Sequence, residues 1–210
     1  MKRFFQAFAY LLGVHVTGLL FLTVFRLLFW IDVRPQVPAE LRDDAGMALT
    51  AFVRGVWFDN VMGCYVLLLP LAVFCIAALL GYYGKWLFRS FHYYFVAAYA
   101  VLFLAAAANI PYFSYFTKVL NSSIFNWFEY GATTASMVVE ESSYYIYIFY
   151  FLAATVLFAL LTGRYTKLLR SHLAPARPFS WKRAGMQLLV SACLVGLCLF
   201  GIRGVWATTR

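Results

Sequence analysis

Charged residues are scarce in this chain, and their scarcity excludes an ordinary soluble domain. Only 12% of the 210 residues are charged, whereas 64% are hydrophobic and 20% are aromatic. One soluble core of this size cannot hide so much apolar surface. The composition therefore predicts an all-α polytopic membrane protein, because a helix satisfies its own backbone hydrogen bonds within hydrocarbon.

Paired cysteines and metal-binding clusters are also lacking. The four cysteines fall inside apolar runs without a Cys-x-x-Cys pair: Cys64, Cys75, Cys193 and Cys198. This spacing indicates neither a disulfide framework nor a zinc site, and it favours packing residues. His15 has no acidic or histidine partner in its apolar run, which is more typical of a helix-packing residue than of a ligand. No metal or other cofactor is therefore expected in this chain.

Five apolar runs are long enough to cross a bilayer as helices. We expect these spans at about residues 4–31, 61–83, 91–108, 144–162 and 186–202. Arg26 lies near the far end of the first run, where its long side chain can reach the headgroups. Asp32 follows closely enough in the sequence to pair with Arg26, but the sequence favours Arg26 as an interfacial anchor.

Two segments between the spans predict amphipathic helices that lie on the outer membrane surface. In residues 39–58 the apolar positions recur at three- and four-residue steps, and the charged residues fall on the other face. In residues 110–142, Phe113, Phe116 and Leu120 share one helical face from which Lys118 is absent. The second segment is polar and aromatic beside nearly charge-free runs, so we expect it to contribute the working surface.

The distribution of charge predicts the orientation. Ten of the seventeen basic residues fall in the connections that are cytoplasmic if the N-terminus is inside, and all eight acidic residues fall on the other side. By the positive-inside rule, this bias places the N-terminus in the cytoplasm and the C-terminus outside. The net charge of +9 therefore reflects topology, and no nucleic-acid partner is expected.

Four short motifs accompany this order of spans and surface segments: Gly55-x-x-Phe58-Asp59, Asn109-Ile-Pro-Tyr-Phe113, Asn121-Ser-Ser-Ile-Phe125 and Glu140-Glu-Ser-Ser-Tyr144. Together they resemble the N-terminal membrane domain of the lipoteichoic acid synthase-like phosphoglycerol transferases, and in particular the sulfatase-family members of Bacteroides-type bacteria. The resemblance covers the whole chain, although its motifs are membrane-domain patterns and include no catalytic fingerprint.

The resemblance implies a location in the bacterial cytoplasmic (inner) membrane, a phospholipid donor and a catalytic domain outside the cytoplasm. That sulfatase-like domain is expected downstream of this chain, with a nucleophilic threonine and a divalent metal such as Mn, Mg or Zn. The chain itself is then expected to have no catalytic residue, to anchor the catalytic domain and to help bind a phosphoglycerol or phosphoethanolamine headgroup.

Seven residues map to the outer level and are candidates for binding the lipid headgroup: Asp59, Asn109, Tyr112, Lys118, Asn121, Glu140 and Glu141. Lys118 suits a phosphate, whereas the carboxylates suit an ammonium or a hydroxyl group. The structural alternative is that Lys118 is an interfacial anchor and that the glutamates are solvated charges. Two other functions stay open, a stand-alone membrane scaffold and a small transporter, but the nearly charge-free spans argue against transport.

Overall fold

Long α-helices make up almost all of the described structure. The computed structural model describes residues 2–38, 45–80, 84–120, 144–171 and 181–203. The elements in these ranges are α1 (Lys2–Val33), the short 3-10 helix η1 (Arg34–Gln36), α3 (Ala45–Leu80), α4 (Lys85–Phe116), α7 (Tyr145–Ser171) and α8 (Trp181–Arg203). No strand occurs among these residues, which confirms the all-α prediction for this part of the chain.

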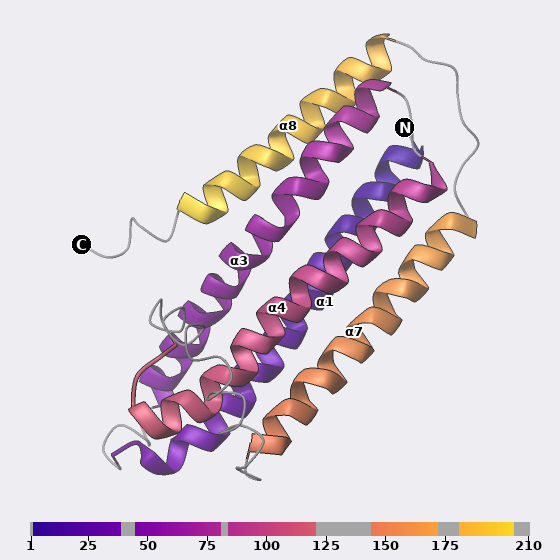
Figure 1. Cartoon of the computed structure of the whole chain (residues 1–210). Coiled ribbons are helices and arrows are strands. Elements are labelled where there is room, and N and C mark those ends of the chain that lie inside the picture. The colour runs from indigo at the N-terminus through magenta and orange to yellow at the C-terminus, as the bar shows by residue number, and fades with distance from the viewer. Residues whose placement is uncertain (1, 39–44, 81–83, 121–143, 172–180, 204–210) are drawn as a thin grey trace, which may run out of the picture.

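The helices lie side by side in one elongated bundle (Figure 1). α1 packs against α3, α4 and α7, while α8 packs along the outer side of α3. Successive long helices run in opposite directions, so the ends of some helices lie beside the starts of others (Figure 1). We call the end where α1 and α4 finish and α3 and α7 begin the Asp32 end. The opposite end, where α7 finishes, is the Arg170 end.

In the described part of the chain, four helices are long and apolar enough to cross a membrane, which indicates a multi-pass membrane protein. Their qualifying segments are Phe4–Gln36, Ala45–Phe74, Trp86–Phe116 and Tyr145–Ser171. The fifth expected span falls in α8, whose apolar part, Gly185–Phe200, is shorter than these four. The count of five spans therefore stays a prediction.

The start of α3 differs from the expected separate surface helix at residues 39–58. Residues 45–80 form one continuous helix of 36 residues, which is about 54 Å long at the usual rise per residue. No helix end separates the amphipathic segment from the span, because residues 59–61 have no turn signal and continue the helix. Residues 39–44 lie outside the described residues, as does most of the second expected surface segment, 110–142.

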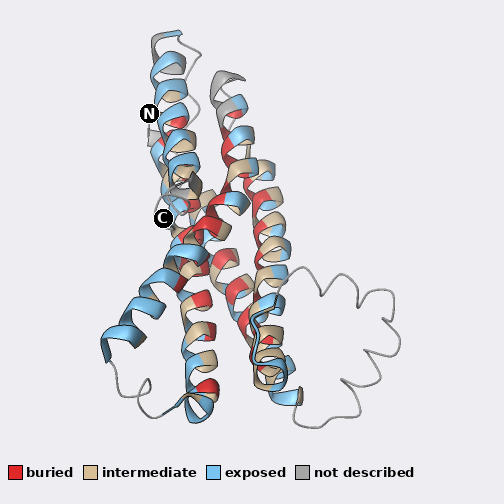
Figure 2. Ribbon diagram, turned by 90° about the vertical axis from the view of Figure 1, so that its left-hand side faces the viewer, coloured by how far each residue is buried: buried red, intermediate tan, exposed pale blue. Residues whose placement is uncertain are grey.

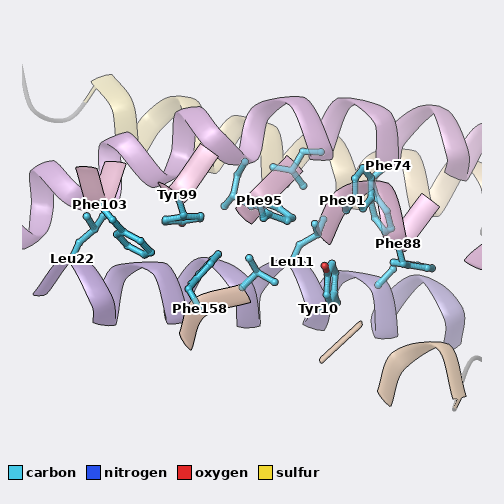
Figure 3. Packing of buried hydrophobic residues seen from close by; sticks show 14 of the residues in the cluster. Tyr10, Leu11, Leu22, Phe74, Phe88, Phe91, Phe95, Tyr99, Phe103 and Phe158 are labelled. Atoms are coloured by element: carbon cyan, nitrogen blue, oxygen red, sulfur yellow. The ribbon is translucent and has the colours of Figure 1, made fainter. Parts of the chain in front are cut away.

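Aromatic side chains fill the centre of the bundle, and α4 supplies many of them. Buried residues recur along one face of α4 at steps of three or four: Phe88, Phe91, Phe95, Tyr99, Phe103, Ala107 and Ile110. Figure 3 shows several of these rings lying between α4 and α1, with Phe158 of α7 beside Tyr99 and Phe103. The Tyr99 and Phe158 ring centroids are 4.8 Å apart. The outward faces of the helices are exposed (Figure 2) and largely apolar, as hydrocarbon requires.

Gly18 allows α1 and α4 to approach each other closely. A Cβ atom at this position would overlap the Tyr99 ring. Only glycine leaves room for that ring, and small residues at helix contacts are a common way to bring membrane helices together. The close contact fixes the register of α1 against α4, and with it the level of every polar side chain along α1.

Candidate functional site at the Asp32 end

An ion pair between Arg26 and Asp59 joins α1 to α3. Arg26 Nη2 donates to Asp59 Oδ1 at 2.7 Å and Arg26 Nε donates to Oδ2 at 3.3 Å. Nη2 also donates to the carbonyl of Gly55 at 2.9 Å. The guanidinium lies against Gly55, where any Cβ would collide with it. Arg26 therefore pairs with Asp59 and not with Asp32, the partner that the sequence allowed.

Asp59 is thus engaged inside the bundle. The side chains of Arg26 and Asp59 are 28% and 12% exposed, so protein atoms cover most of the ion pair. A charge placed in hydrocarbon is costly unless it is paired, and each residue here satisfies the other. The sequence signal for such a pair is a base inside one apolar run, Arg26, and an acid just before the next, Asp59. The arrangement suits structural coupling of α1 and α3 more than ligand binding.

The next residue of α3, Asn60, makes a second polar contact with α1. His15 Nε2 and Asn60 Oδ1 are 3.1 Å apart, which fits the expectation of a hydrogen-bonded packing histidine. Nδ1 of His15 and the hydroxyl of Tyr99 are buried without a hydrogen-bond partner, and both lie close to Gly63. Polar contacts between helices replace water as hydrogen-bond partners in a membrane.

Asp32 links α1 to α4 and α7. Ser114 Oγ donates to Asp32 Oδ2 at 2.9 Å, and the Tyr147 hydroxyl donates to Oδ1 at 3.2 Å. Both partners are remote in the sequence, which is why spacing alone did not identify them. Both carboxylate oxygens have donors, so Asp32 holds three helix ends together.

The end of α4 positions Lys118. Thr117 caps the helix in the left-handed region at φ 53°, and its N–H donates to the carbonyl of Phe113 at 2.8 Å. A β-branched residue is strained in this region. The Leu120 N–H donates to Asn109 Oδ1 at 2.8 Å, which folds the chain after Lys118 back onto the last turns of α4. Lys118 itself is exposed.

Two further cations are exposed near this end. Arg34 in η1 lies over the indole ring of Trp30, with its guanidinium carbon 4.9 Å from the ring centroid. Arg54 is exposed on α3 and lines a hollow of about 440 Å³ with Gly46, Met47, Thr50 and Ala51. Indole rings and long basic side chains are frequent at the headgroup level of a bilayer. Neither arginine is among the seven residues predicted to bind the headgroup, although both lie in the polar region after the first span.

The structure therefore brings part of the predicted site together. Asn109, Tyr112 and Lys118 share the end of α4, where Tyr112 is half-buried with its ring centroid 4.8 Å from that of Phe116. Asp59 lies in the ion pair with Arg26. The remaining predicted residues, Asn121, Glu140 and Glu141, lie outside the described residues.

Within the described ranges, no three His, Cys, Asp or Glu side chains gather as potential metal ligands. The polar groups at the Asp32 end instead offer cations and amide and hydroxyl groups. Cations and amide donors suit hydrogen bonding to an anion, and nothing in this set resembles an activated nucleophile with its base.

No family model matches the chain, and neither a curated protein nor a solved structure is similar to it.

Proposed function

We propose that this chain is the membrane domain of a sulfatase-family phosphoglycerol or phosphoethanolamine transferase. In this proposal it anchors a catalytic domain that follows outside the cytoplasm, and its Asp32 end binds the phosphate of the phospholipid donor at the outer leaflet. The divalent metal and the nucleophile belong to the catalytic domain. The membrane is the bacterial cytoplasmic (inner) membrane, as the resemblance of the sequence implies.

The balance of accessible charge at the Asp32 end is the observation that supports headgroup binding. Among the described residues, both carboxylates at this end are engaged, Asp59 by Arg26 and Asp32 by Ser114 and Tyr147. Arg34, Arg54 and Lys118 are exposed. With Asp59 paired to Arg26, these three cations outnumber the one remaining described carboxylate, Asp32, and an excess of positive charge attracts a phosphate.

The proposed roles of the predicted residues follow from their contacts. Lys118 binds the phosphate as an exposed cation, and Asn109 holds the backbone that carries it. Tyr112 packs at the headgroup level, where an amphipathic ring is stable. Asp59 positions Arg26 and does not contact the headgroup. Glu140 and Glu141 keep their proposed role of holding the ammonium or hydroxyl part, and Asn121 stays a candidate for binding the headgroup.

Photo-cross-linking at the Asp32 end tests this proposal. The protein is reconstituted with phosphatidylglycerol that carries a diazirine in its headgroup, and the labelled peptides are mapped by mass spectrometry. We expect labelling within residues 109–120. Lys118→Ala removes a charge-assisted hydrogen bond and reduces this labelling about tenfold.

Lys85→Ala is the matched control, because Lys85 begins α4 at the opposite end. It removes the same charge and leaves the labelling of residues 109–120 unchanged. Equal labelling of this segment in the parent and in Lys118→Ala would remove Lys118 from the proposed site, and the Asp32 end would then serve only as an anchor.

A further inference from the structure

Two buried polar side chains lie in the middle of the bundle, where α1 packs against α3 and α4. His15 is near the midpoint of α1, and Tyr99 is near the midpoint of α4. The two residues are 8% and 0% exposed. Neither His15 Nδ1 nor the Tyr99 hydroxyl has a hydrogen-bond partner among the described residues. Such groups are costly at this depth of a membrane, because hydrocarbon offers them no partner.

The two atoms face the same small region beside Gly63 of α3. A Cβ atom added at Gly63 would lie 2.9 Å from His15 Nδ1 and 3.4 Å from the Tyr99 hydroxyl oxygen. Gly18 of α1 lies against the same hydroxyl, since a Cβ atom there would be 2.6 Å from its oxygen. Both polar atoms are therefore close to each other, and the two glycines place no side chain between them.

The hydrogen-bonding roles of the two atoms are complementary. The Asn60 Oδ1 atom, 3.1 Å from His15 Nε2, can only accept, so Nε2 carries a proton and donates it. A charged imidazole is costly in hydrocarbon, and a neutral one has a single N–H, which leaves Nδ1 as an acceptor. The Tyr99 hydroxyl is a donor that needs an acceptor. A water molecule accepts one hydrogen bond while it donates another, so it matches both atoms.

We propose that one water molecule is bound between these side chains, accepting a hydrogen bond from Tyr99 and donating one to Nδ1 of His15. Buried waters typically bond to protein polar groups that otherwise lack partners. The chain Tyr99–water–His15–Asn60 then joins α4, α1 and α3 within the membrane. This site shares no residue with the proposed headgroup site and does not depend on it.

Radiolytic labelling of the whole protein in detergent micelles tests for this water. The protein is equilibrated in water that carries a heavy oxygen isotope and is exposed to a short X-ray pulse, which converts water into hydroxyl radicals. A radical adds to an aromatic ring only where a water lies beside that ring, and mass spectrometry of peptides locates the heavy oxygen. We expect it on Tyr99. Phe103 is the internal control, because it is equally buried one turn further along α4 and has no polar atom to hold a water.

Gly63→Ala tests whether the water lies where the geometry places it. The added Cβ atom would be 2.7 Å from Cε1 of the His15 ring, so it crowds the region between the two side chains and should abolish the labelling of Tyr99. Gly196→Ala is the matched control, because a Cβ atom there meets no atom within 4 Å, and it should keep the labelling. Lys118→Ala should also keep it, which separates this site from the headgroup site. Circular dichroism checks the helix content of every variant.

Two outcomes overturn the proposal. If Tyr99 in the parent protein is labelled no more than Phe103, no water lies beside its ring, and Tyr99 must bond to His15 directly. This result does not depend on how any variant folds. If Gly63→Ala is labelled at Tyr99 as strongly as the parent, the water that reaches Tyr99 is not held beside Gly63.

Discussion

The Arg26–Asp59 pair shows how individual residues fix the packing of this membrane domain. The guanidinium makes three hydrogen bonds across the contact between α1 and α3, and Gly55 leaves room for it. The sequence offered Asp32 as the partner of Arg26, whereas the structure pairs Arg26 with Asp59. Asp32 is six residues away on the same helix, which turns it about 240° around the axis. Its side chain therefore points away from Arg26.

A double-mutant cycle tests this pair. Arg26→Met or Asp59→Leu alone should lower the free energy of unfolding by about 1.5–3 kcal/mol, because each leaves a charged partner without its hydrogen bonds. The double variant should lose clearly less than the sum of the two. Unfolding in mixed micelles, followed by circular dichroism, measures all four proteins. Strict additivity would mean that the two side chains do not stabilise each other.

At the scale of the elements, the sequence predicted where most helices lie but not where they end. The apolar runs identified the five long helices of the described ranges, because hydrophobicity reports the part of a helix that suits lipid. α3 begins well before its apolar run, since amphipathic residues from Ala45 onward form a helix equally well. Contacts between helices, such as Asp32 with Tyr147, depend on the register that close-packed residues like Gly18 set. A single sequence does not reveal that register.

Cross-linking tests the placement of α8 against α3. The thiols of Cys64 on α3 and Cys198 on α8 are near enough to share a side-chain hydrogen bond. Copper phenanthroline with oxygen should therefore join them in a disulfide when the other two cysteines are replaced by serine. Peptide mass mapping detects the bond.

Cys193 provides the control, because it is exposed on the same helix. A protein that keeps only Cys64 and Cys193 should form much less of the intramolecular disulfide. Similar yields for the two pairs would contradict the packing of α8 against α3.

For the whole molecule, the described bundle separates two kinds of surface. The Asp32 end presents Arg34, Arg54 and Lys118, whereas toward the Arg170 end a hollow between α1 and α7 is lined mainly by apolar side chains such as Leu168 and Leu169. Acids outnumber bases in the connections that the sequence assigns to the outside, yet the described acids are paired internally. Counts of charged residues could not predict which charges stay exposed at this end, because ion pairs and hydrogen bonds depend on the folded contacts. The proposed headgroup site requires that Lys118 faces the outside of the cell.

Labelling of single cysteines in intact cells tests that orientation most directly. Lys118→Cys and Arg164→Cys are introduced separately into a protein whose four native cysteines are replaced, and a maleimide that does not cross the cytoplasmic membrane is added. We predict that Lys118→Cys is labelled in intact cells, whereas Arg164→Cys is labelled only after the membrane is permeabilised. Labelling of Arg164→Cys in intact cells, with protection of Lys118→Cys, would contradict the proposed binding of an outer-leaflet headgroup.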